Sequence, residues 1–214
     1  MVMTTTPATP PPPTYRDEMR SKMLGIAKRV VADEGLGALQ ARRVADEAGC
    51  AVGTIYNVFK NLDNLIVETN SATLTDLGAA LVAVAQKGAG IRGPHAVADR
   101  LQALGLAYLD FAIAQNASWR AVFDHHMAPG NPVPDWYRQK QAQLFALVEQ
   151  VLGDVITDEQ HRSRAARALF SAVHGVVMLS LSGTLGPTDR AETEAQVRFI
   201  VQAVAEGVTH ASGK

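Results

Sequence analysis

The stretch LQARRVADEAGCAVGTIYNVFK, residues 39–60, decides the fold because it predicts two short helices joined by a tight turn. In the first helix, the apolar side chains of Val44, Ala45 and Ala48 recur at helical spacing. Gly49 then ends the helix, because glycine most easily adopts the left-handed backbone conformation needed just past a helix end.

The second helix of this stretch begins near Ala51. Its apolar residues occupy positions i, i+3, i+4 and i+7 of a helical pattern, namely Val52, Ile55, Tyr56 and Phe59. Two helices joined by a turn of about three residues form a helix-turn-helix unit. The second helix of such a unit can lie in the major groove of DNA while the first crosses the backbone.

The same segment closely resembles the DNA-binding region of the TetR family of bacterial transcriptional repressors. The resemblance runs from Tyr15 to Glu68 and includes Gly35, which ends the preceding helix. The matching residues are Val44, Ala45, Ala48, Gly49, Cys50, Gly53, Thr54, Ile55, Tyr56, Phe59, Lys60 and Leu65. The resemblance implies a DNA-binding transcriptional regulator, in the first place a repressor that a small-molecule effector releases from a palindromic operator.

Composition favours an all-α fold, because alanine is abundant and alternating β-branched runs are scarce. Hydrophobic residues make up 47% of the 214 residues, enough for a substantial core. The helical patterns give about nine helices, the number that the resemblance implies. They are expected at residues 15–34, 40–48, 51–59, 62–86, 95–115, 118–127, 135–152, 159–182 and 190–208.

Three segments follow from these patterns. Residues 1–14 are rich in Thr and Pro and predict a disordered tail, since consecutive prolines prefer an extended chain with nothing to pack. Residues 15–61 form the expected three-helix, helix-turn-helix DNA-binding domain. Residues 62–214 form the expected C-terminal helical domain, which the resemblance assigns to effector binding and dimerisation.

Charge and cysteine content point to a cytoplasmic protein. The net charge is −1, but residues 1–60 carry eight Lys/Arg against six Asp/Glu, consistent with a DNA-reading N-terminal end. Cys50 is the only cysteine, so no intrachain disulfide forms, as suits a reducing compartment. Redox sensing through Cys50 stays open as an alternative. No signal peptide and no apolar run of about 20 residues is evident.

The resemblance implies a set of DNA contacts on the two short helices. Arg42 suits the O6/N7 edge of guanine, whereas an intramolecular pair or plain solvation is the alternative. Ala51 stands where the family often has Ser, so an N-cap of about 1 kcal/mol is lost. The expected DNA-contacting residues are Gln40, Ala41, Arg42, Ala51, Val52, Gly53, Thr54, Tyr56, Asn57 and Lys60. Arg16, Arg20 and Lys22 could reach phosphates as well or remain solvated.

The last two expected helices carry more than one apolar face, and a second apolar face must be buried against something. In the family these helices pair with their two-fold mates, which predicts a homodimer; packing within the chain is the alternative. The expected interface residues are Phe170, Val173, Val177, Val197, Val201 and Val204.

Aromatic and soft side chains gather in the C-terminal half, where the family holds a small effector. This half, with Trp136, His174 and Gly175, also resembles the WHG-type regulatory domain of some members. The expected pocket residues are Tyr108, Phe111, Trp119, Phe123, His126, Trp136, Tyr137, His174 and Met178. A small apolar or amphipathic effector fits such a pocket, while ordinary core packing is the alternative for any one of these residues.

Several classes of site are not expected. Adjacent histidines such as His125 and His126 point about 100° apart on a helix, so they predict no metal site. The sequence carries no nucleophile elbow, phosphate-binding loop, zinc motif or dinucleotide glycine pattern, so we expect neither an enzyme nor a cofactor. A constitutive DNA-binding regulator without effector, an activator and, least favoured, a helical enzyme remain the alternatives.

Overall fold

The computed structural model describes residues 14–93, 95–184, 186 and 188–212, with only the backbone for 210–212. Within these residues the chain forms nine α-helices and one 3-10 helix and contains no strand, which confirms the all-α prediction. Apart from Thr14, the expected tail lies outside the described residues. Thr14 is the N-cap of the first helix, because its side chain accepts a hydrogen bond from the amide of Asp17.

The helices follow one another along the chain with short connections. The first five elements are α1 (Tyr15–Glu34), η1 (Leu36–Ala38), α2 (Ala41–Ala48), α3 (Val52–Phe59) and α4 (Leu62–Gly88). The others are α5 (Ala96–Ala114), α6 (Asn116–Asp124), α7 (Asp135–Leu152), α8 (Glu159–Ser182) and α9 (Arg190–Ser212). The predicted bounds of α1, α7 and α8 agree to the residue. The prediction placed α6 about two residues too late along the chain and ended α9 too early.

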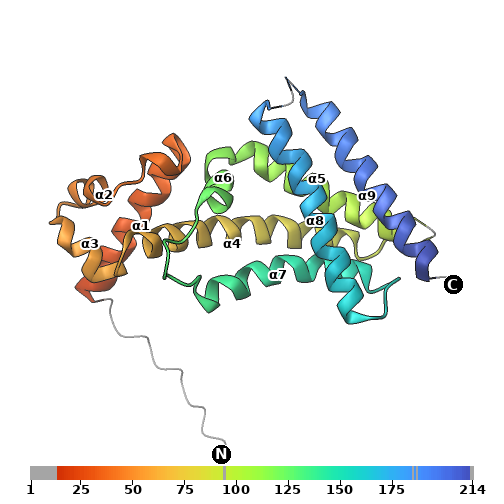
Figure 1. The fold of residues 1–214 in the computed structure, drawn as a ribbon, viewed down its shortest axis with the longest axis horizontal. Helices are drawn as coiled ribbons and strands as arrows, with labels where there is room; N and C mark the ends of the chain where they lie inside the picture. The colour runs from red at the N-terminus through yellow and green to blue at the C-terminus, as the bar shows by residue number, and fades with distance from the viewer. Residues whose placement is uncertain (1–13, 94, 185, 187, 213–214) are drawn as a thin grey trace, which may run out of the picture.

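Helices α1, α2 and α3 form an N-terminal lobe at one end of the elongated molecule (Figure 1). Their shared core includes Met23, Val44 and Ile55, one from each helix and all fully buried. Each of these helices is short or has only one apolar face, so the three must pack together to bury it.

Helix α4 runs from the N-terminal lobe into the C-terminal lobe (Figure 1). Near its start, Leu65 and Ile66 are buried in the core of the N-terminal lobe. Further along, Leu77 and Leu81 are buried in the core of the other lobe. The helix that opens the expected C-terminal domain therefore contributes to both cores.

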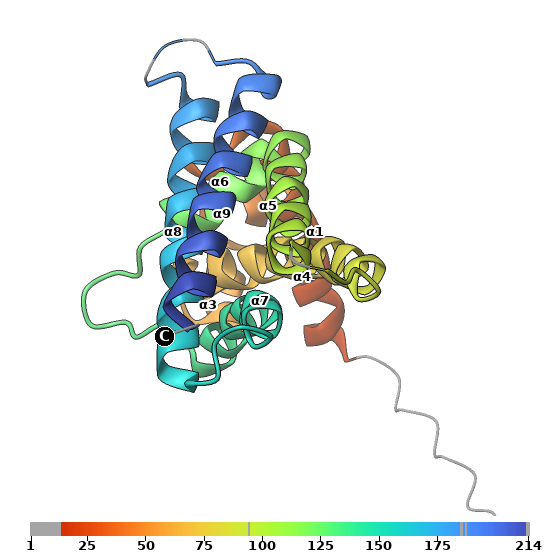
Figure 2. The ribbon, with the colours of Figure 1, turned by 90° about the vertical axis from the view of Figure 1, so that its right-hand side faces the viewer.

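The C-terminal lobe consists of α5, α7, α8 and α9 together with the second half of α4, which packs against α5 and α7. Helices α8 and α9 lie side by side, with α5 next to them (Figure 2). A glycine lets α5 approach α9 closely, because a Cβ atom at Gly105 would lie 3.0 Å from Cγ1 of Val197.

Helix α6 connects the two lobes. Its Trp119 is buried in the C-terminal core, whereas Ala121, two residues later, is buried in the N-terminal core. The side-chain amide of Asn70 on α4 donates a buried hydrogen bond of 2.9 Å to the carbonyl oxygen of Ala121. Any shift of α6 relative to α4 must therefore break a bond shielded from water, which makes the position of α6 well defined.

By length and composition alone, α8 is apolar enough to cross a membrane, which corrects the expectation that no such run exists. A core helix of a soluble protein can have the same length and apolar composition, so these two properties by themselves are weak support for a membrane span. Only 22% of the apolar window of α8 is buried within the chain. The rest of this window is half-buried or exposed, and Leu179 is its one exposed large hydrophobic residue among those that the structure describes.

Candidate nucleic-acid interface and ligand cavity

The turn between α2 and α3 has the geometry that the sequence predicts. Gly49 adopts the left-handed conformation, with φ 74° and ψ 38°, and ends α2. The amide of Cys50 then donates a 3.0 Å hydrogen bond to the carbonyl of Ala45, which closes the turn. The Cys50 thiol is half-buried against the N-terminal core. As predicted, Ala51 provides no side-chain cap for α3.

Helix α3 buries one face and exposes the other. Ile55, Val58 and Phe59 are buried in the N-terminal core. On the opposite side Tyr56 and Asn57 are exposed, as are Ala51, Gly53 and Lys60. Val52 and Thr54 lie at the edge and are half-buried. This exposed face contains most of the α3 residues expected to contact DNA, whereas the side chain of Val52 also packs against the N-terminal core.

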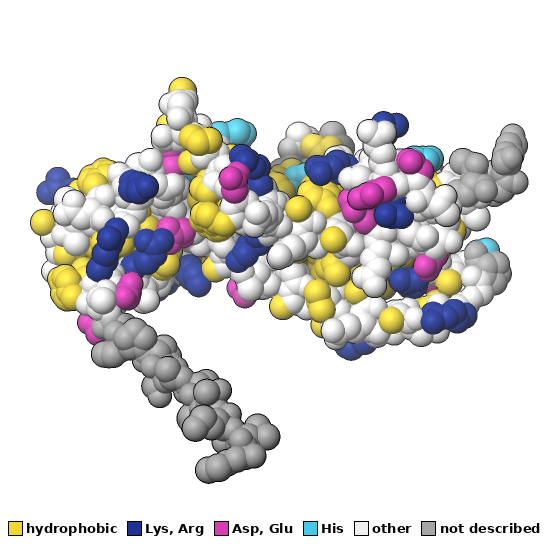
Figure 3. Space-filling model, turned by 90° about the horizontal axis from the view of Figure 1, so that it is seen from below, with side chains coloured by type: hydrophobic (Ala, Val, Ile, Leu, Met, Phe, Trp, Pro, Cys, Tyr) yellow, Lys and Arg dark blue, Asp and Glu magenta, His cyan; other side chains and the backbone are white. Residues whose placement is uncertain are grey.

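Two neighbouring arginines on α2 have different surroundings. Arg43 forms ion pairs with Glu34 and Glu47, so its guanidinium is committed to its own chain. The exposed Arg42 forms no hydrogen bond or ion pair with any residue that the structure describes. Arg42 is thus available to an outside partner. Lys and Arg side chains are visible over the lobe of α1, α2 and α3 when the molecule is seen from below (Figure 3).

One of the expected DNA contacts lies in the core. Ala41 is only 9% exposed, because it begins the apolar stripe of α2 that continues through Val44, Ala45 and Ala48. The side chain of Ala41 is therefore a packing residue, and the expectation that it contacts DNA is corrected. Gln40, which precedes it at the N-cap of α2, is exposed.

The basic residues at the start of α1 bind the helix-turn-helix itself. Lys22 Nζ donates a 2.7 Å hydrogen bond to the carbonyl of Ala48, the last residue of α2. Arg16 and Arg20 donate, at 3.2 Å each, to carbonyl oxygens in the last turn of α3. Cations near a helix C-terminus are favourable because they meet unpaired carbonyl groups and the negative end of the helix dipole. Each of these three side chains thus has a partner within the chain, and contact of their remaining N–H groups with phosphate stays a prediction.

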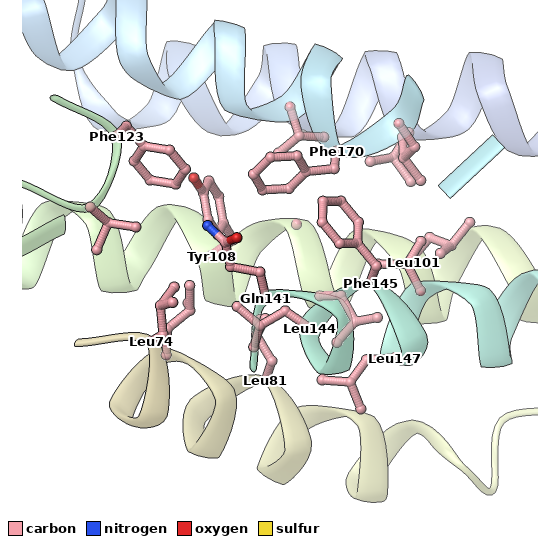
Figure 4. A pocket seen from close by; sticks show the side chains of 18 residues that line it. Leu74, Leu81, Leu101, Tyr108, Phe123, Gln141, Leu144, Phe145, Leu147 and Phe170 are labelled. Atoms are coloured by element: carbon pink, nitrogen blue, oxygen red, sulfur yellow. The ribbon is translucent and has the colours of Figure 1, made fainter. Parts of the chain in front are cut away.

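A cavity of about 210 Å³ lies in the C-terminal lobe, between α4, α5, α7 and α8 (Figure 4). Side chains from all four helices line it, together with Phe123 and Val122 of α6 and Val201 of α9. All but two of the lining residues are apolar, and the exceptions are Tyr108 and Gln141. The chemistry that this cavity offers is therefore almost entirely that of hydrophobic contact.

The hydroxyl of Tyr108 is fixed by two buried partners. It accepts a 2.9 Å hydrogen bond from Nε1 of Trp119 and lies 2.7 Å from Nδ1 of His174. Burial raises the pKa of Tyr108 well above its ordinary value of 10.0, and the hydrogen bond from Trp119 opposes that shift. Burial also lowers the pKa of His174 below 6.5, so its imidazole is neutral and can accept from the hydroxyl.

The predicted pocket residues are only partly brought together. Tyr108 and Phe123 line the cavity, while Trp119 and His174 lie behind them and hold Tyr108 in place. The remaining five do not line it, namely Phe111, His126, Trp136, Tyr137 and Met178. Their periodic spacing did not reveal which direction each would face.

Each displaced residue has a physical reason for its position. Trp136 is 45% exposed in the first turn of α7, and His126 is exposed in the connector after α6. Tyr137 is buried in a separate small cluster with Val67 and Leu74 of α4. Phe111 and Met178 pack elsewhere on the C-terminal core.

Sequence reasoning missed Gln141, the one cavity residue with an uncommitted polar side chain. A signal was present, because Gln141 lies between Tyr137 and Leu144 at helical spacing, on the face of α7 that packs inward. A polar residue on an apolar helical stripe is a candidate for ligand contact. Its neighbours Arg138, Lys140 and Gln143 obscured that position within a polar run.

The expected dimer residues are mostly covered within the chain. Val173 and Val177 of α8 and Val197 and Val201 of α9 are buried in the C-terminal core, so they cannot also form an exposed dimer surface. Phe170 lines the cavity. Val204 is half-buried. The prediction assigned the inward faces of α8 and α9 to the interface, because local periodicity does not say which of two apolar faces the chain itself covers.

Exposed apolar side chains of α8 and α9 lie elsewhere. Phe199 is 73% exposed on α9, and Leu179 is 41% exposed on α8. Both are large hydrophobic residues, and their removal from water lowers the free energy.

Within the described residues, no group of three or more His, Cys, Asp or Glu is placed to hold a metal ion. His125 instead lies beside Asp63, with 3.6 Å between Nε2 and Oδ1. The other carboxylate oxygen of Asp63 accepts hydrogen bonds from the Ala128 amide and the Asn131 side chain. Asp63 thereby fastens the α6–α7 connector to the first turn of α4.

A helix-turn-helix at the end of a long helical body, with an apolar cavity in that body, defines the class of DNA-binding transcription regulators. Residues 24–69 match the family model described as bacterial regulatory proteins, tetR family. Residues 101–204 match that of the tetracyclin repressor-like C-terminal domain. The chain belongs to the TetR family of transcriptional regulators. It is accordingly a transcription factor and not an enzyme.

Solved structures share this fold at low sequence identity. A protein with unknown function from Rhodococcus sp. RHA1 is 21% identical, with a TM-score of 0.65 over 90% of this chain and 94% of that one. A TetR-family transcriptional regulator from Streptomyces coelicolor is 17% identical, with a TM-score of 0.61 over 91% and 82%. The multidrug binding protein EbrR, complexed with imidazole, is 21% identical, with a TM-score of 0.60 over 86% and 93%. No curated protein sequence matches the chain.

Proposed function

We propose that this regulator is a cytoplasmic homodimer that represses transcription by binding a near-palindromic operator and is released by a small-molecule effector. TetR-family regulators bind DNA and ligands and form dimers. Two helix-turn-helix units related by two-fold symmetry meet half-sites about 34–36 Å apart, or a multiple of that distance, which requires a near-palindromic site.

The single observation that carries the effector role is the position of α6. Phe123 and Val122 form part of the cavity wall, while the adjacent Ala121 is buried in the core of the N-terminal lobe. Helix α6 also packs against α1 and α4. A ligand that pushes on Phe123 therefore acts on an element in direct contact with the DNA-binding lobe.

Coupling of this kind is a shift between two conformations. In one conformation the two recognition helices match successive grooves, and in the other their spacing does not fit the operator. The effector shifts the population only by as much as it binds the second conformation more tightly than the first. A constitutive regulator without effector is less favoured, because a filled C-terminal core would suit it better than an apolar cavity does.

Dimerisation is supported by the uncovered apolar surface of α8 and α9. Phe199 and Leu179 are exposed there, and only 22% of the apolar window of α8 is fully buried within the chain. Large exposed apolar side chains on a soluble protein are typical of a protein interface. The relative EbrR is described as a multidrug binding protein, so a ligand-binding role is known for this fold.

The deciding experiment measures binding of the purified protein to DNA fragments that flank its own gene, across a series of salt concentrations. We expect saturable binding that weakens with salt, as phosphate contacts require. Arg42→Ala is expected to weaken it by roughly tenfold, since a good base contact contributes about 1–3 kcal/mol. Arg43→Ala is the matched control, because that side chain is already paired with Glu34 and Glu47.

The same fragment then serves to test candidate effectors by their ability to release the protein. Equally weak binding of all three proteins to every fragment would remove support for sequence-specific repression at this locus. Unchanged operator affinity with the cavity saturated by ligand would contradict the effector role.

A further inference from the structure

The wall of the cavity carries no charged side chain. Apart from Tyr108 and Gln141, its lining consists of aliphatic and aromatic residues and one glycine. A charged ligand would lose its hydration on entry and find no opposite charge to replace it. The lining therefore selects against carboxylates, phosphates and ammonium groups.

The hydroxyl of Tyr108 already has two protein partners. It accepts a hydrogen bond from Nε1 of Trp119, which can only donate, and it lies 2.7 Å from His174 Nδ1. The hydroxyl is thus a fixed part of the wall.

Gln141 is the one polar side chain of the lining with no partner. Its amide forms no hydrogen bond with any residue that the structure describes, although the side chain is half-buried. Figure 4 shows its polar end pointing from α7 toward Tyr108. A side-chain amide can donate two hydrogen bonds and accept two, so it can bind a hydroxyl, carbonyl or amide group of a ligand.

The size of the cavity sets the size of the ligand. An engineered apolar cavity of about 150 Å³ binds benzene. The cavity here measures about 210 Å³, so it has room for one ring with a short substituent.

We infer that the cavity binds an uncharged, mainly apolar molecule of about one ring, whose single polar group hydrogen-bonds to Gln141. Gln141 is then the residue that determines specificity. The inference names the chemical class of the effector and rests on the effector role proposed above.

Four probes of nearly equal shape test this assignment: 2-phenylethanol, propylbenzene, phenylacetate and 2-phenylethylammonium. Binding to the full-length protein is measured by calorimetry without DNA, so the result does not depend on any effect on the operator. We expect 2-phenylethanol to bind most tightly and the two ions at least about tenfold more weakly.

Substitution of Gln141 separates its hydrogen bond from the hydrophobic contacts that the other lining residues make. Gln141→Leu is expected to weaken the binding of 2-phenylethanol by about tenfold. Its affinity for propylbenzene should be unchanged or higher. Gln143→Leu, two residues further along α7 and exposed, should alter neither. Circular dichroism melting of each variant verifies that the fold is retained.

The outcomes distinguish this inference from the proposed function. Equal binding of the ions and the alcohol, equal loss of every probe in Gln141→Leu, or no binding of any probe would overturn the inference. Selective binding of 2-phenylethanol without release of DNA would support the assigned cavity chemistry and contradict the effector role. Release of DNA by a charged compound that enters this cavity would support the effector role and contradict the assigned cavity chemistry.

Discussion

The hydroxyl oxygen of Tyr108 lies 2.7 Å from Nδ1 of His174 and thereby joins α5 to α8 inside the C-terminal lobe. The same oxygen accepts a hydrogen bond from Trp119 of α6. One buried hydroxyl thus connects three helices next to the cavity. The ring of Phe123 packs against that of His174, with centroids 4.2 Å apart.

Tyr108→Phe is expected to lower the free energy of unfolding by about 2 kcal/mol, because it leaves Trp119 Nε1 and His174 Nδ1 buried without their partner. Urea denaturation followed by circular dichroism measures the change. Tyr137→Phe is the control: Tyr137 is also buried, but its hydroxyl bonds to no residue that the structure describes. Equal stability of the two variants would show that the Tyr108 network contributes little.

Stability is expected to fall as the pH decreases below neutrality, because of two half-buried histidines, His125 and His174. Burial lowers the pKa of His174, and it also lowers that of His125, where the charge of Asp63 opposes the shift and His126 adds to it. A lowered pKa means that the unfolded chain binds more protons than the folded chain. The stabilisation is therefore complete above pH 6.5, the ordinary value, and is lost as pH falls through the folded pKa.

Thermal melting between pH 7.5 and 5 tests this expectation. His174→Asn retains a hydrogen-bond acceptor near the position of Nδ1 but cannot titrate, so its melting temperature should depend less on pH than that of the wild type. An identical pH dependence in the wild type and in His174→Asn would exclude His174 as a source of the effect.

Sequence reasoning succeeded where a helix boundary is marked locally. Helix α8 follows Asp158, whose side chain accepts from the His161 amide, and ends at Gly183 in the left-handed conformation. Asp and Gly at these two positions are visible in the sequence and act through the chain's own backbone. The helix-turn-helix was predictable for the same reason, since Gly49 and the apolar spacing around it are local features.

The direction that each helical face takes could not be predicted in this way. Val197 and Phe199 are neighbours on an apolar helix, yet Val197 is fully buried and Phe199 is 73% exposed. Which face the chain covers depends on α5, which is distant in sequence and approaches closely at Gly105. The cavity residues depend on the same long-range packing, so Gln141 was missed and Trp136 was wrongly included.

The dimer proposed for this protein should dissociate when a charge is placed on the exposed apolar surface of α9. Phe199→Asp is expected to shift sedimentation from dimer to monomer at micromolar concentration, because burial of an unpaired carboxylate is unfavourable. Val82→Asp is the control, since Val82 is an exposed apolar residue of α4 away from α8 and α9. By contrast, Val197→Asp should unfold the lobe, because Val197 lies in the core.

A wild-type monomer in solution would contradict the proposed dimer. An unchanged dimer in Phe199→Asp would place the interface elsewhere. Circular dichroism of Phe199→Asp shows whether the lobe remains folded. Retained helicity with loss of the dimer is the expected result, since Phe199 contributes little to the chain's own core.

Lys60 is the only non-glycine residue with a positive φ among those that the structure describes, with φ 69° and ψ −45°. Its amide donates a 2.9 Å hydrogen bond to the carbonyl of Tyr56 and ends α3, so the backbone conformation is needed for the turn into α4. A side chain in this region costs about 1 kcal/mol relative to glycine. We therefore predict that the exposed ammonium group of Lys60 contacts a DNA phosphate, and that this contact offsets the unfavourable backbone conformation.

Lys60→Gly and Lys60→Ala separate these two contributions. Both are expected to weaken operator binding and to reduce its dependence on salt by about one phosphate contact. Lys60→Gly should be more stable than Lys60→Ala by about 1 kcal/mol in urea denaturation, because only glycine relieves the backbone. If Lys60→Gly binds DNA as tightly as the wild type across the salt series, the ammonium group makes no phosphate contact. If the two variants are equally stable, the backbone at position 60 carries no strain, and the retention of lysine there needs another cause.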